Sequence, residues 1–263
     1  MGFLVMFIVA LVISAIGFRK FVWFISLGYG FSIAGIGAAL LAMFLVQLTP
    51  VTVIMVILLI IYGLRLGGYL LIRERRSASY QATMKNEIKD GSSTPFFVKI
   101  SVWLACALLY ACETSPVLFR LSNNATTDVV AIVGAAIMAT GIVLESVADS
   151  TKNRFKQQHP KRFCDVGVFR LVRCPNYLGE VLTWTGVFVS GWTALQGVWQ
   201  WLAAVVGWAC IVWIMFGGAR RLEIRQTKNY GDNPEYRAYV NRTPILIPFV
   251  PLYSVAKCKW LVG

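Results

Sequence analysis

Long apolar runs separated by short polar connectors dominate the chain. A bilayer core about 30 Å thick needs about 20 apolar residues in a helix, and most of these runs reach that length. The pattern predicts an all-α, polytopic membrane protein with seven transmembrane helices. The predicted spans are residues 3–17, 21–46, 51–72, 96–118, 128–148, 178–195 and 197–218.

The first run is short and ends at Phe18-Arg19-Lys20, as a signal peptide also would. Neither a small-residue cleavage pattern nor a polar mature domain follows it, so we interpret it as a helix. Only 14% of all residues are charged, against about 25% in soluble domains. With no long linker in the chain, residues 1–263 are expected to form a single integral membrane domain.

The basic residues predict how the helices are oriented. Of 25 Lys and Arg residues, all but Arg120 lie at or beyond the ends of odd-numbered spans. The connectors near 47–50 and 194–197 carry no charge. By the positive-inside rule, the N-terminus lies outside and the C-terminus lies in the cytoplasm. We therefore expect a protein of the bacterial inner membrane or endoplasmic reticulum whose site opens to the cytoplasm.

Charge and cysteine content narrow the list of partners. The net charge of +13 could suggest nucleic acid, but positive-inside bias and anionic leaflet lipid account for most of it. A large anionic ligand on the cytoplasmic side would account for the rest. The six cysteines form no CxxC pair and His159 is the only histidine. The sequence therefore predicts no nucleic acid partner, no metal site and no disulfide framework.

Three polar regions interrupt or follow the apolar runs. Residues 73–95 are predicted to form a short helix and a turn. Residues 149–177 form a second connector, with a break at His159-Pro160. The region from Arg220 continues the last helix and then turns at 229–234.

The most informative stretch is 170–180, where a basic, proline-broken segment leads into an apolar helix. It carries Arg170, Arg173, Asn176 and Tyr177, with Glu180 in the first turn of the helix. Charges at the edge of a membrane helix indicate a functional site. The alternative is an arginine pair that anchors the helix end with Glu180 as counter-ion, but anchoring requires neither the amide nor the phenol.

Other polar residues fit an anionic ligand. Tyr62 and Arg65 lie one turn apart on the third span and share a face. Glu145 and Asp149 are spaced i, i+4, so these like charges repel unless something compensates. Ribose hydroxyls would compensate, and so would pairing with Lys152 or Arg154.

Several charged residues follow the last span directly and have two interpretations. They could be surface charge or could form one wall of a phosphate site. The residues are Arg220, Arg221, Glu223 and Arg225.

Together these residues suit a phosphate-bearing cofactor below a lipid-soluble substrate. Arginine binds phosphate bidentately, and a carboxylate accepts hydrogen bonds from ribose or an amide. A tyrosine hydroxyl, with a pKa near 10, can protonate an enolate oxygen as it forms. These residue types indicate a nicotinamide or an adenosyl cofactor without distinguishing the two.

The segment from Arg170 to Glu180 resembles the RHPNYxGE signature of the membrane steroid reductases. It is most similar to the branch related to steroid 5α-reductase known as the DUF1295 group. Tyr62-Gly-Leu-Arg65, Leu144-Glu145-Ser-Val-Ala-Asp149 and Pro234-Glu235-Tyr236-Arg237 extend the resemblance, which covers about residues 60–250. It implies seven transmembrane helices, NADPH bound on the cytoplasmic side, and reduction of an activated C=C bond in a steroid-like lipid.

The resemblance also implies roles for individual residues. Asn176, Tyr177 and Glu180 would hold the nicotinamide end, with Glu180 also catalytic. Tyr62 would be catalytic and face the substrate. Independently of the resemblance, Tyr29 is the best-placed polar group in the second span, and we predict that it also binds the substrate. The ribose and phosphates would be held by Arg65, Asp149, Arg173 and Arg221. Beyond the resemblance, we predict that Glu145, Arg154 and Arg170 also belong to the cofactor site.

Two positions depart from the family pattern. Cys174 stands where the motif has His, which removes one hydrogen-bonding group. The second span lacks the acid that this family uses to bind the substrate carbonyl, and its polar residues are Ser26, Tyr29 and Ser32. The resemblance therefore assigns the cofactor half of the site and leaves the substrate half open.

The leading hypothesis is NADPH-dependent reduction of a steroid or other hydrophobic enone lipid in the membrane. One alternative is an S-adenosylmethionine-dependent methyltransferase similar to the isoprenylcysteine carboxyl methyltransferases, which share an Arg-His-Pro-x-Tyr-x-Gly element. Asn176 and Glu180 favour the reductase form of the motif. The other alternative is a non-catalytic lipid-binding protein of the same fold.

Overall fold

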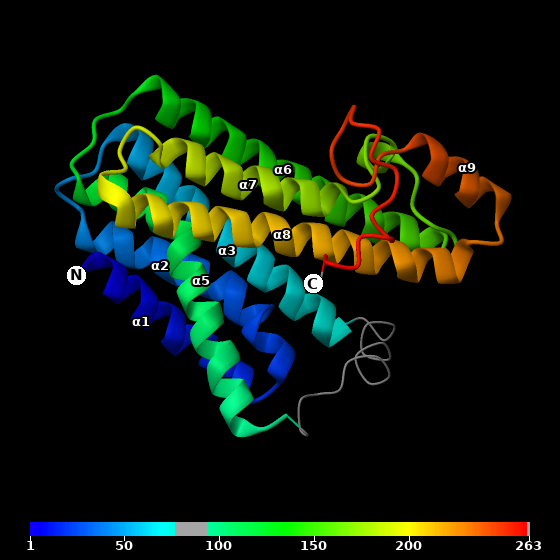
Figure 1. Cartoon of the computed structure of the whole chain (residues 1–263), viewed down its shortest axis with the longest axis horizontal. Coiled ribbons are helices and arrows are strands. Elements are labelled where there is room, and N and C mark those ends of the chain that lie inside the picture. Colours follow the sequence, from blue (N-terminus) through cyan, green and yellow to red (C-terminus); the bar gives the residue numbers. More distant parts are fainter. Residues whose placement is uncertain (77–93, 262–263) are drawn as a thin grey trace. The chain divides into compact units, whose positions relative to one another are not determined.

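The computed structural model describes residues 1–76 and 94–261, and this part of the chain contains helices and no strand (Figure 1). The predicted all-α class is therefore confirmed. The helix and turn predicted within 73–95 fall largely outside the described residues. The elements are α1 (Gly2–Ser14), η1 (Ala15–Phe18), η2 (Phe21–Phe24), α2 (Leu27–Met43), α3 (Pro50–Arg76), α5 (Phe96–Ser122), α6 (Val129–Gln158), η3 (Gly167–Arg170), α7 (Pro175–Gly191), α8 (Gly197–Tyr230) and α9 (Pro234–Arg242).

Five described segments are long and apolar enough to cross a membrane: Phe21–Met43, Pro50–Arg75, Phe96–Ser122, Val129–Gln158 and Gly197–Tyr230. In length and composition, these segments resemble the transmembrane helices of an integral membrane protein. The first predicted span corresponds to a shorter apolar segment, Gly2–Phe18, and the sixth to α7, which has 17 residues. The count of seven spans and the orientation of the termini stay predictions.

Two helices extend well beyond the apolar runs that predicted them. Helix α6 continues past residue 148 to Gln158, and α8 continues past 218 to Tyr230. Residues 149–158 contain neither proline nor glycine, so backbone hydrogen bonding continues after the apolar run ends. The predicted break at His159-Pro160 is confirmed, because α6 ends at the residue before His159.

The chain divides into two compact units whose boundaries fall within α6, α7 and α8. Unit 1 comprises residues 1–135 and 187–208, and unit 2 comprises 136–186 and 209–263. Each unit is described by itself below. The expectation of a single integral membrane domain over 1–263 stays a prediction.

In unit 1, α2 and α3 pack through backbone contacts that only glycine permits. A Cβ atom added to Gly30 would lie 2.6 Å from the Gly67 nitrogen, and one on Gly63 would lie 2.4 Å from the Gly30 oxygen. Small residues drive helix association in membranes because they let the backbones approach closely. This contact determines where Tyr29 and Tyr62, the neighbours of Gly30 and Gly63, are held.

Unit 1 also explains Arg120, the exception in the charge pattern. The side chain is 1% exposed and forms an ion pair with Asp128. Its Nη1 donates to the Ser190 carbonyl at 2.7 Å and to the Thr193 hydroxyl at 3.1 Å. Its Nη2 also donates to the carbonyl of residue 126. The arginine is a structural residue that joins α5, the start of α6 and the end of α7.

The carboxyl group of Asp128 is held in its charged form by this network. Burial opposes ionisation, but hydrogen bonds from the Ala131 amide, the Thr193 hydroxyl and Arg120 outweigh it. The pKa of Asp128 therefore lies below its usual value of 3.8. The Ala131 bond, 2.9 Å long, also satisfies one of the free amides at the start of α6.

In unit 2, the segment after α9 folds back beside the connector that leads into α7 (Figure 1). The Arg173 amide donates to the Pro244 carbonyl at 2.9 Å, and the Cys174 amide donates to the Ile245 carbonyl at 3.0 Å. An apolar cluster lies beneath this pairing and includes Val172, Cys174, Leu178, Ala219, Leu222, Ile245, Leu246, Val255 and Leu261. It ties the sequence motif to residues 70 to 90 positions later.

A second cluster supports the same connector. Phe163, Tyr236 and Tyr239 are buried together, with the Phe163 and Tyr239 rings stacked at 5.4 Å. The Tyr239 hydroxyl donates to the Phe169 carbonyl at 2.7 Å. Helix α9 is thereby fastened to η3, three residues before the buried Arg173.

Candidate functional site

The two tyrosines predicted to face the substrate form a hydrogen-bonded pair inside unit 1. Tyr29 and Tyr62 are 7% and 0% exposed, and their hydroxyl oxygens lie 3.0 Å apart. Their rings meet edge to face. Arg65 follows one turn later on α3 and is half-buried. The structure therefore brings the second and third predicted spans together at the predicted polar positions.

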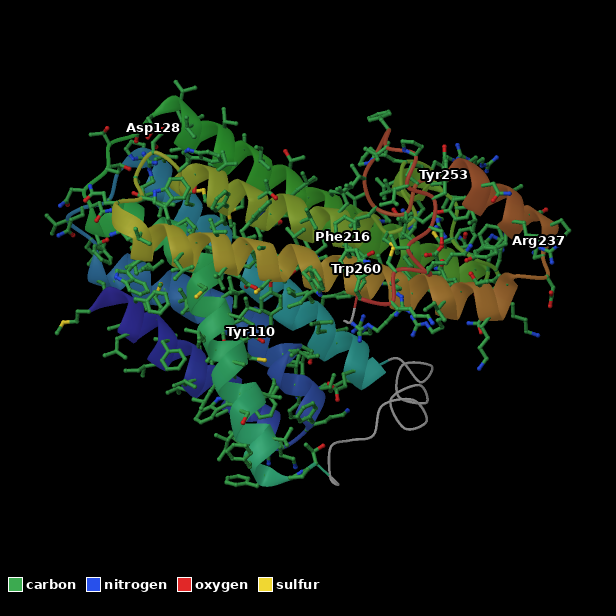
Figure 2. All side chains as sticks on the ribbon, viewed as in Figure 1. Tyr110, Asp128, Phe216, Arg237, Tyr253 and Trp260 are labelled. Carbon is green, nitrogen blue, oxygen red and sulfur yellow. The ribbon has the colours of Figure 1, made fainter. Side chains whose placement is uncertain are left out.

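Sequence reasoning missed two residues of α5, namely Tyr110, which lies beside this pair, and Glu113. The Tyr110 ring lies 5.0 Å from the Tyr29 ring, and its hydroxyl donates to the Phe24 carbonyl at 2.7 Å (Tyr110 is labelled in Figure 2). Glu113 follows one turn later on α5 and is 3% exposed. A carboxyl inside an apolar span was a usable signal, because such residues are costly and mark functional sites.

In unit 2, the predicted cofactor residue Arg173 is buried and partly bonded. Its Nη2 donates to Glu223 at 3.1 Å and to the Tyr253 carbonyl. Glu223 in turn accepts from the Val255 amide at 2.9 Å. The Arg173 Nε and Nη1 groups and the Tyr236 hydroxyl make no hydrogen bond within the described residues. The Tyr236 hydroxyl is close enough to Arg173 for the guanidinium to oppose the rise that burial causes in the tyrosine's pKa. The guanidinium therefore keeps donors for a further acceptor.

The carboxylates of the site lie where α6 and α7 approach most closely. A Cβ atom on Gly141 would lie 2.5 Å from the Gly179 oxygen, and one on Gly179 would lie 2.8 Å from the Glu145 Cβ. Glu145 and Glu180 are 4% and 6% exposed. The Trp184 indole donates to Glu180 at 3.4 Å. Glycine 179 of the motif is therefore required for packing.

Asn176 and Tyr177 occupy the first turn of α7 and are both half-buried. The Tyr177 ring lies against α8 at Gly218, where an added Cβ atom would come 3.3 Å from the ring. A larger residue at 218 would displace the phenol. The amide and phenol of the motif thus remain partly accessible, whereas Arg173 and Glu180 are covered.

The remaining predicted cofactor residues are more peripheral. Asp149 is half-buried on α6. Three arginines are exposed and form no hydrogen bond or ion pair with the described residues, namely Arg154, Arg170 and Arg221. The structure thus places Glu145 against Gly179 of α7 and buries Arg173 just before that helix. The three exposed arginines are not held by these residues.

Comparison with known proteins identifies the family. The profile of the family described as "Protein of unknown function (DUF1295)" matches residues 6–243. The chain belongs to this family. The predicted resemblance is confirmed.

Two of the proteins to which this chain is similar are reductases. The chain is 33% identical over 64 residues to steroid 5-alpha-reductase DET2 of Arabidopsis thaliana, covering 24% of each chain. It is 35% identical over 83 residues to very-long-chain enoyl-CoA reductase of Dictyostelium discoideum, covering 32% of this chain and 23% of the relative. The matches thus span about a quarter of each relative's length. No solved structure matches the chain.

The cysteine that replaces histidine in the motif is a buried, neutral thiol in this DUF1295 protein. Cys174 is 2% exposed, and burial raises the pKa of its thiol to about 12, with Arg173 opposing that rise. The thiol is therefore neutral at physiological pH and packs as a small apolar group. Among residues 1–76 and 94–261, no group of three His, Cys, Asp or Glu side chains could hold a metal ion.

Proposed function

We propose that this DUF1295 protein is an NADPH-dependent membrane oxidoreductase that reduces an activated C=C bond in a steroid or other hydrophobic enone lipid. The observation that carries the proposal is Arg173, a buried guanidinium with two donor groups not bonded to the described residues. Leaving such donors unmet is costly, and an anionic oxygen ligand would satisfy them. The reductase names of both relatives support the same reaction class.

The chain's own residues divide the work of holding the cofactor. Arg173 would bind a phosphate, with the exposed Arg154, Arg170 and Arg221 adding long-range attraction, and Arg65 would act similarly from α3. Asn176, Tyr177 and Glu180 would orient the nicotinamide amide, while Glu145 and Asp149 would accept from ribose hydroxyls. When bound, NADPH supplies the hydride, and the protein contributes orientation and exclusion of water.

The tyrosine pair would act on the substrate carbonyl. Each hydroxyl has one proton, so Tyr62 can donate to a carbonyl only if Tyr29 donates to Tyr62 across their 3.0 Å contact. That order strengthens the Tyr62 donor, because hydrogen bonds in a chain polarise one another. Tyr62 would then stabilise the oxygen as enolate charge develops on it. This site is proposed to open to the cytoplasm, following the predicted orientation.

The proposal is tested first by cofactor choice. Detergent-purified protein is heated alone and with NADPH, NADH or S-adenosylmethionine. A ligand present at about 100 times its Kd should stabilise the native state by about 2.7 kcal/mol. NADPH is expected to give the largest rise in unfolding temperature. Stabilisation by S-adenosylmethionine without NADPH would instead assign a methyltransferase, and no response to any of the three would assign a lipid-binding protein.

The second test separates binding from chemistry. Tyr62→Phe keeps the ring and removes the hydroxyl, so NADPH affinity should be unchanged. Turnover should fall on the order of 10²–10³, the usual effect of removing one such donor. The measurement is NADPH oxidation with a panel of lipid enones. Tyr29→Phe should give a smaller loss, because the donor to substrate remains. Wild-type turnover by Tyr62→Phe would remove the pair from the mechanism.

A further inference from the structure

Residues 255–261 combine buried anchors with outward-facing basic and aromatic side chains. Val255 and Leu261 are 2% and 4% exposed and belong to the apolar cluster under the motif. Between them, Lys257, Lys259 and Trp260 are exposed. The Lys259 amide donates to the Lys257 carbonyl at 2.9 Å. Neither lysine side chain forms a hydrogen bond or ion pair with the described residues. The segment is thus fixed on one side and presents two cations and an indole on the other.

This segment runs along α8 from the edge of its apolar span toward the interior of that span. The Arg220 Nε donates to the Ala256 carbonyl at 3.1 Å, and Arg220 is the first charged residue after the apolar run. The Trp260 ring packs on the Trp213 ring at 4.9 Å, and Trp213 lies seven residues, or about 10 Å of helix, before Arg220 (Figure 2 labels Trp260). Residues 256–260 therefore descend beside a membrane helix.

The exposed aromatic pair indicates the depth at which the segment lies. Trp213 is 47% exposed on an apolar helix, and Trp260 is 61% exposed. Tryptophan concentrates where acyl chains meet headgroups, because its ring is apolar and its N–H is polar. Lysines on the water side of such a pair lie at the level of lipid phosphate. The arrangement therefore fits a headgroup with an apolar tail below it.

We propose that residues 255–261, with Trp213 and Arg220, form a binding site for an anionic phospholipid. Lys257 and Lys259 contact the phosphate and the acidic headgroup, and the Trp213–Trp260 pair lies against the upper acyl chain. Charge complementarity decides the occupant, since two uncompensated lysines disfavour a second copy of this basic chain at the same place. The site consists of unit 2 residues and shares none with the proposed substrate residues Tyr29 and Tyr62.

The test measures lipid-dependent stability. The chain in detergent is titrated with phosphatidylglycerol or with phosphatidylcholine, and the unfolding temperature is followed. Phosphatidylglycerol should stabilise the protein at a lower concentration than phosphatidylcholine does. Lys257→Gln/Lys259→Gln should raise its half-saturating concentration roughly 25-fold, from roughly fivefold per lysine near an anionic surface. Raising salt from about 0.05 M to about 0.5 M should weaken the wild-type response and barely affect the variant.

Matched variants keep the result interpretable. Lys161→Gln/Lys228→Gln removes two exposed lysines elsewhere in unit 2 and should leave the half-saturating concentration unchanged. Trp260→Ala should weaken the stabilisation by both lipids. Trp199→Ala, at an exposed position in unit 1, should change the stabilisation by neither lipid. Equal stabilisation by both lipids, or an unchanged response of the double lysine variant, would overturn the proposal. A dimer that Trp260→Ala dissociates would also overturn it, because the occupant would then be a second copy.

Discussion

The two fully buried arginines, Arg120 and Arg173, are bonded very differently. Both are at most 2% exposed, and each lies beside a carboxylate in its own unit. Arg120 uses both terminal nitrogens, on Asp128, two carbonyl oxygens and a hydroxyl. Arg173 uses Nη2 alone, while its Nε and Nη1 find no acceptor within the described residues.

We interpret this difference as one between a structural charge, at Arg120, and the proposed ligand-directed charge, at Arg173. A buried cation is tolerated when its donors are met. Arg120 meets that condition at both terminal nitrogens, with protein groups from three segments, and only its Nε makes no hydrogen bond within the described residues. Arg173 meets it only in part, and it immediately precedes the Asn176-Tyr177 turn of the family motif. Under the proposed function, the number of remaining donors, rather than burial alone, distinguishes the two arginines. Each prediction below tests that distinction.

The largest effect is expected from Arg120→Met. Removing the cation leaves Asp128 and two backbone carbonyls without their donor, and breaking a buried pair typically costs 3–5 kcal/mol. The free energy of unfolding in detergent should fall by a corresponding amount, and the unfolding temperature should fall with it. NADPH affinity of the protein that remains folded at low temperature should be unchanged. A large loss of NADPH affinity with little loss of stability would place Arg120 in the site and void the comparison.

The second prediction concerns cofactor affinity at Arg173. Arg173→Gln should weaken the binding of NADPH by about 1.5–3 kcal/mol, the range for a charge-assisted hydrogen bond. Because that change also leaves Glu223 buried without its partner, Arg173→Gln/Glu223→Gln provides the neutral background. The double variant should regain stability and still bind NADPH weakly, as measured by titration.

Glu223→Gln alone is the control for this pair. It keeps the guanidinium and the acceptor for the Val255 amide, so NADPH affinity should be retained or raised. Recovery of wild-type affinity in the double variant would show that Arg173 only supports the fold.

The third prediction uses the depressed pKa of Asp128. Because its folded pKa lies below 3.8, the ionised carboxylate stabilises the fold fully above that value. This contribution is lost as pH falls through the lower folded pKa. Asp128→Asn should therefore be less stable than wild type at pH 5 to 7, with the gap closing in stronger acid. Since Asp128 is 33% exposed, the gap should be smaller than the Arg120→Met effect. A gap that is constant with pH would contradict the network.

The smallest effect is expected at Cys174, the neighbour of Arg173. A thiol with a pKa of about 12 has almost no thiolate at neutral or mildly basic pH. Alkylation of Cys174 by iodoacetamide, followed by mass spectrometry, should stay slow in the native state from about pH 7 to about pH 9. The rate should rise after unfolding. Fast native labelling would mean that the Arg173 surroundings are open to water.

Local features of this chain were predictable because their causes are local. The apolar runs, the break at His159-Pro160 and the polar turn near Asn233 follow from composition and from proline and glycine positions. The extension of α6 over residues 149–158 was missed, because a span ends where apolar residues end while a helix ends where hydrogen bonding fails.

The nonlocal parts of the site could not be predicted in the same way. The partners of Arg120 at Ser190 and Thr193, and the partner of Arg173 at Tyr253, lie some 70 to 80 residues away in sequence. No spacing rule relates such positions. Glu113 is a different case, since an acid in an apolar run is visible in the sequence, although only the structure shows that it is buried.

The pairing of Arg173 with residues 244–255 has a consequence for biosynthesis. Translation proceeds from the N-terminus, so α7 is made well before its backbone partners Pro244 and Ile245 exist. Until residue 255 emerges, the Arg173 guanidinium lacks the Tyr253 carbonyl, and Glu223 lacks the Val255 amide. The nascent chain can insert its helices early, but it completes the motif last. Chains stalled in that interval would expose a buried charge, which is the kind of defect that quality-control proteases recognise.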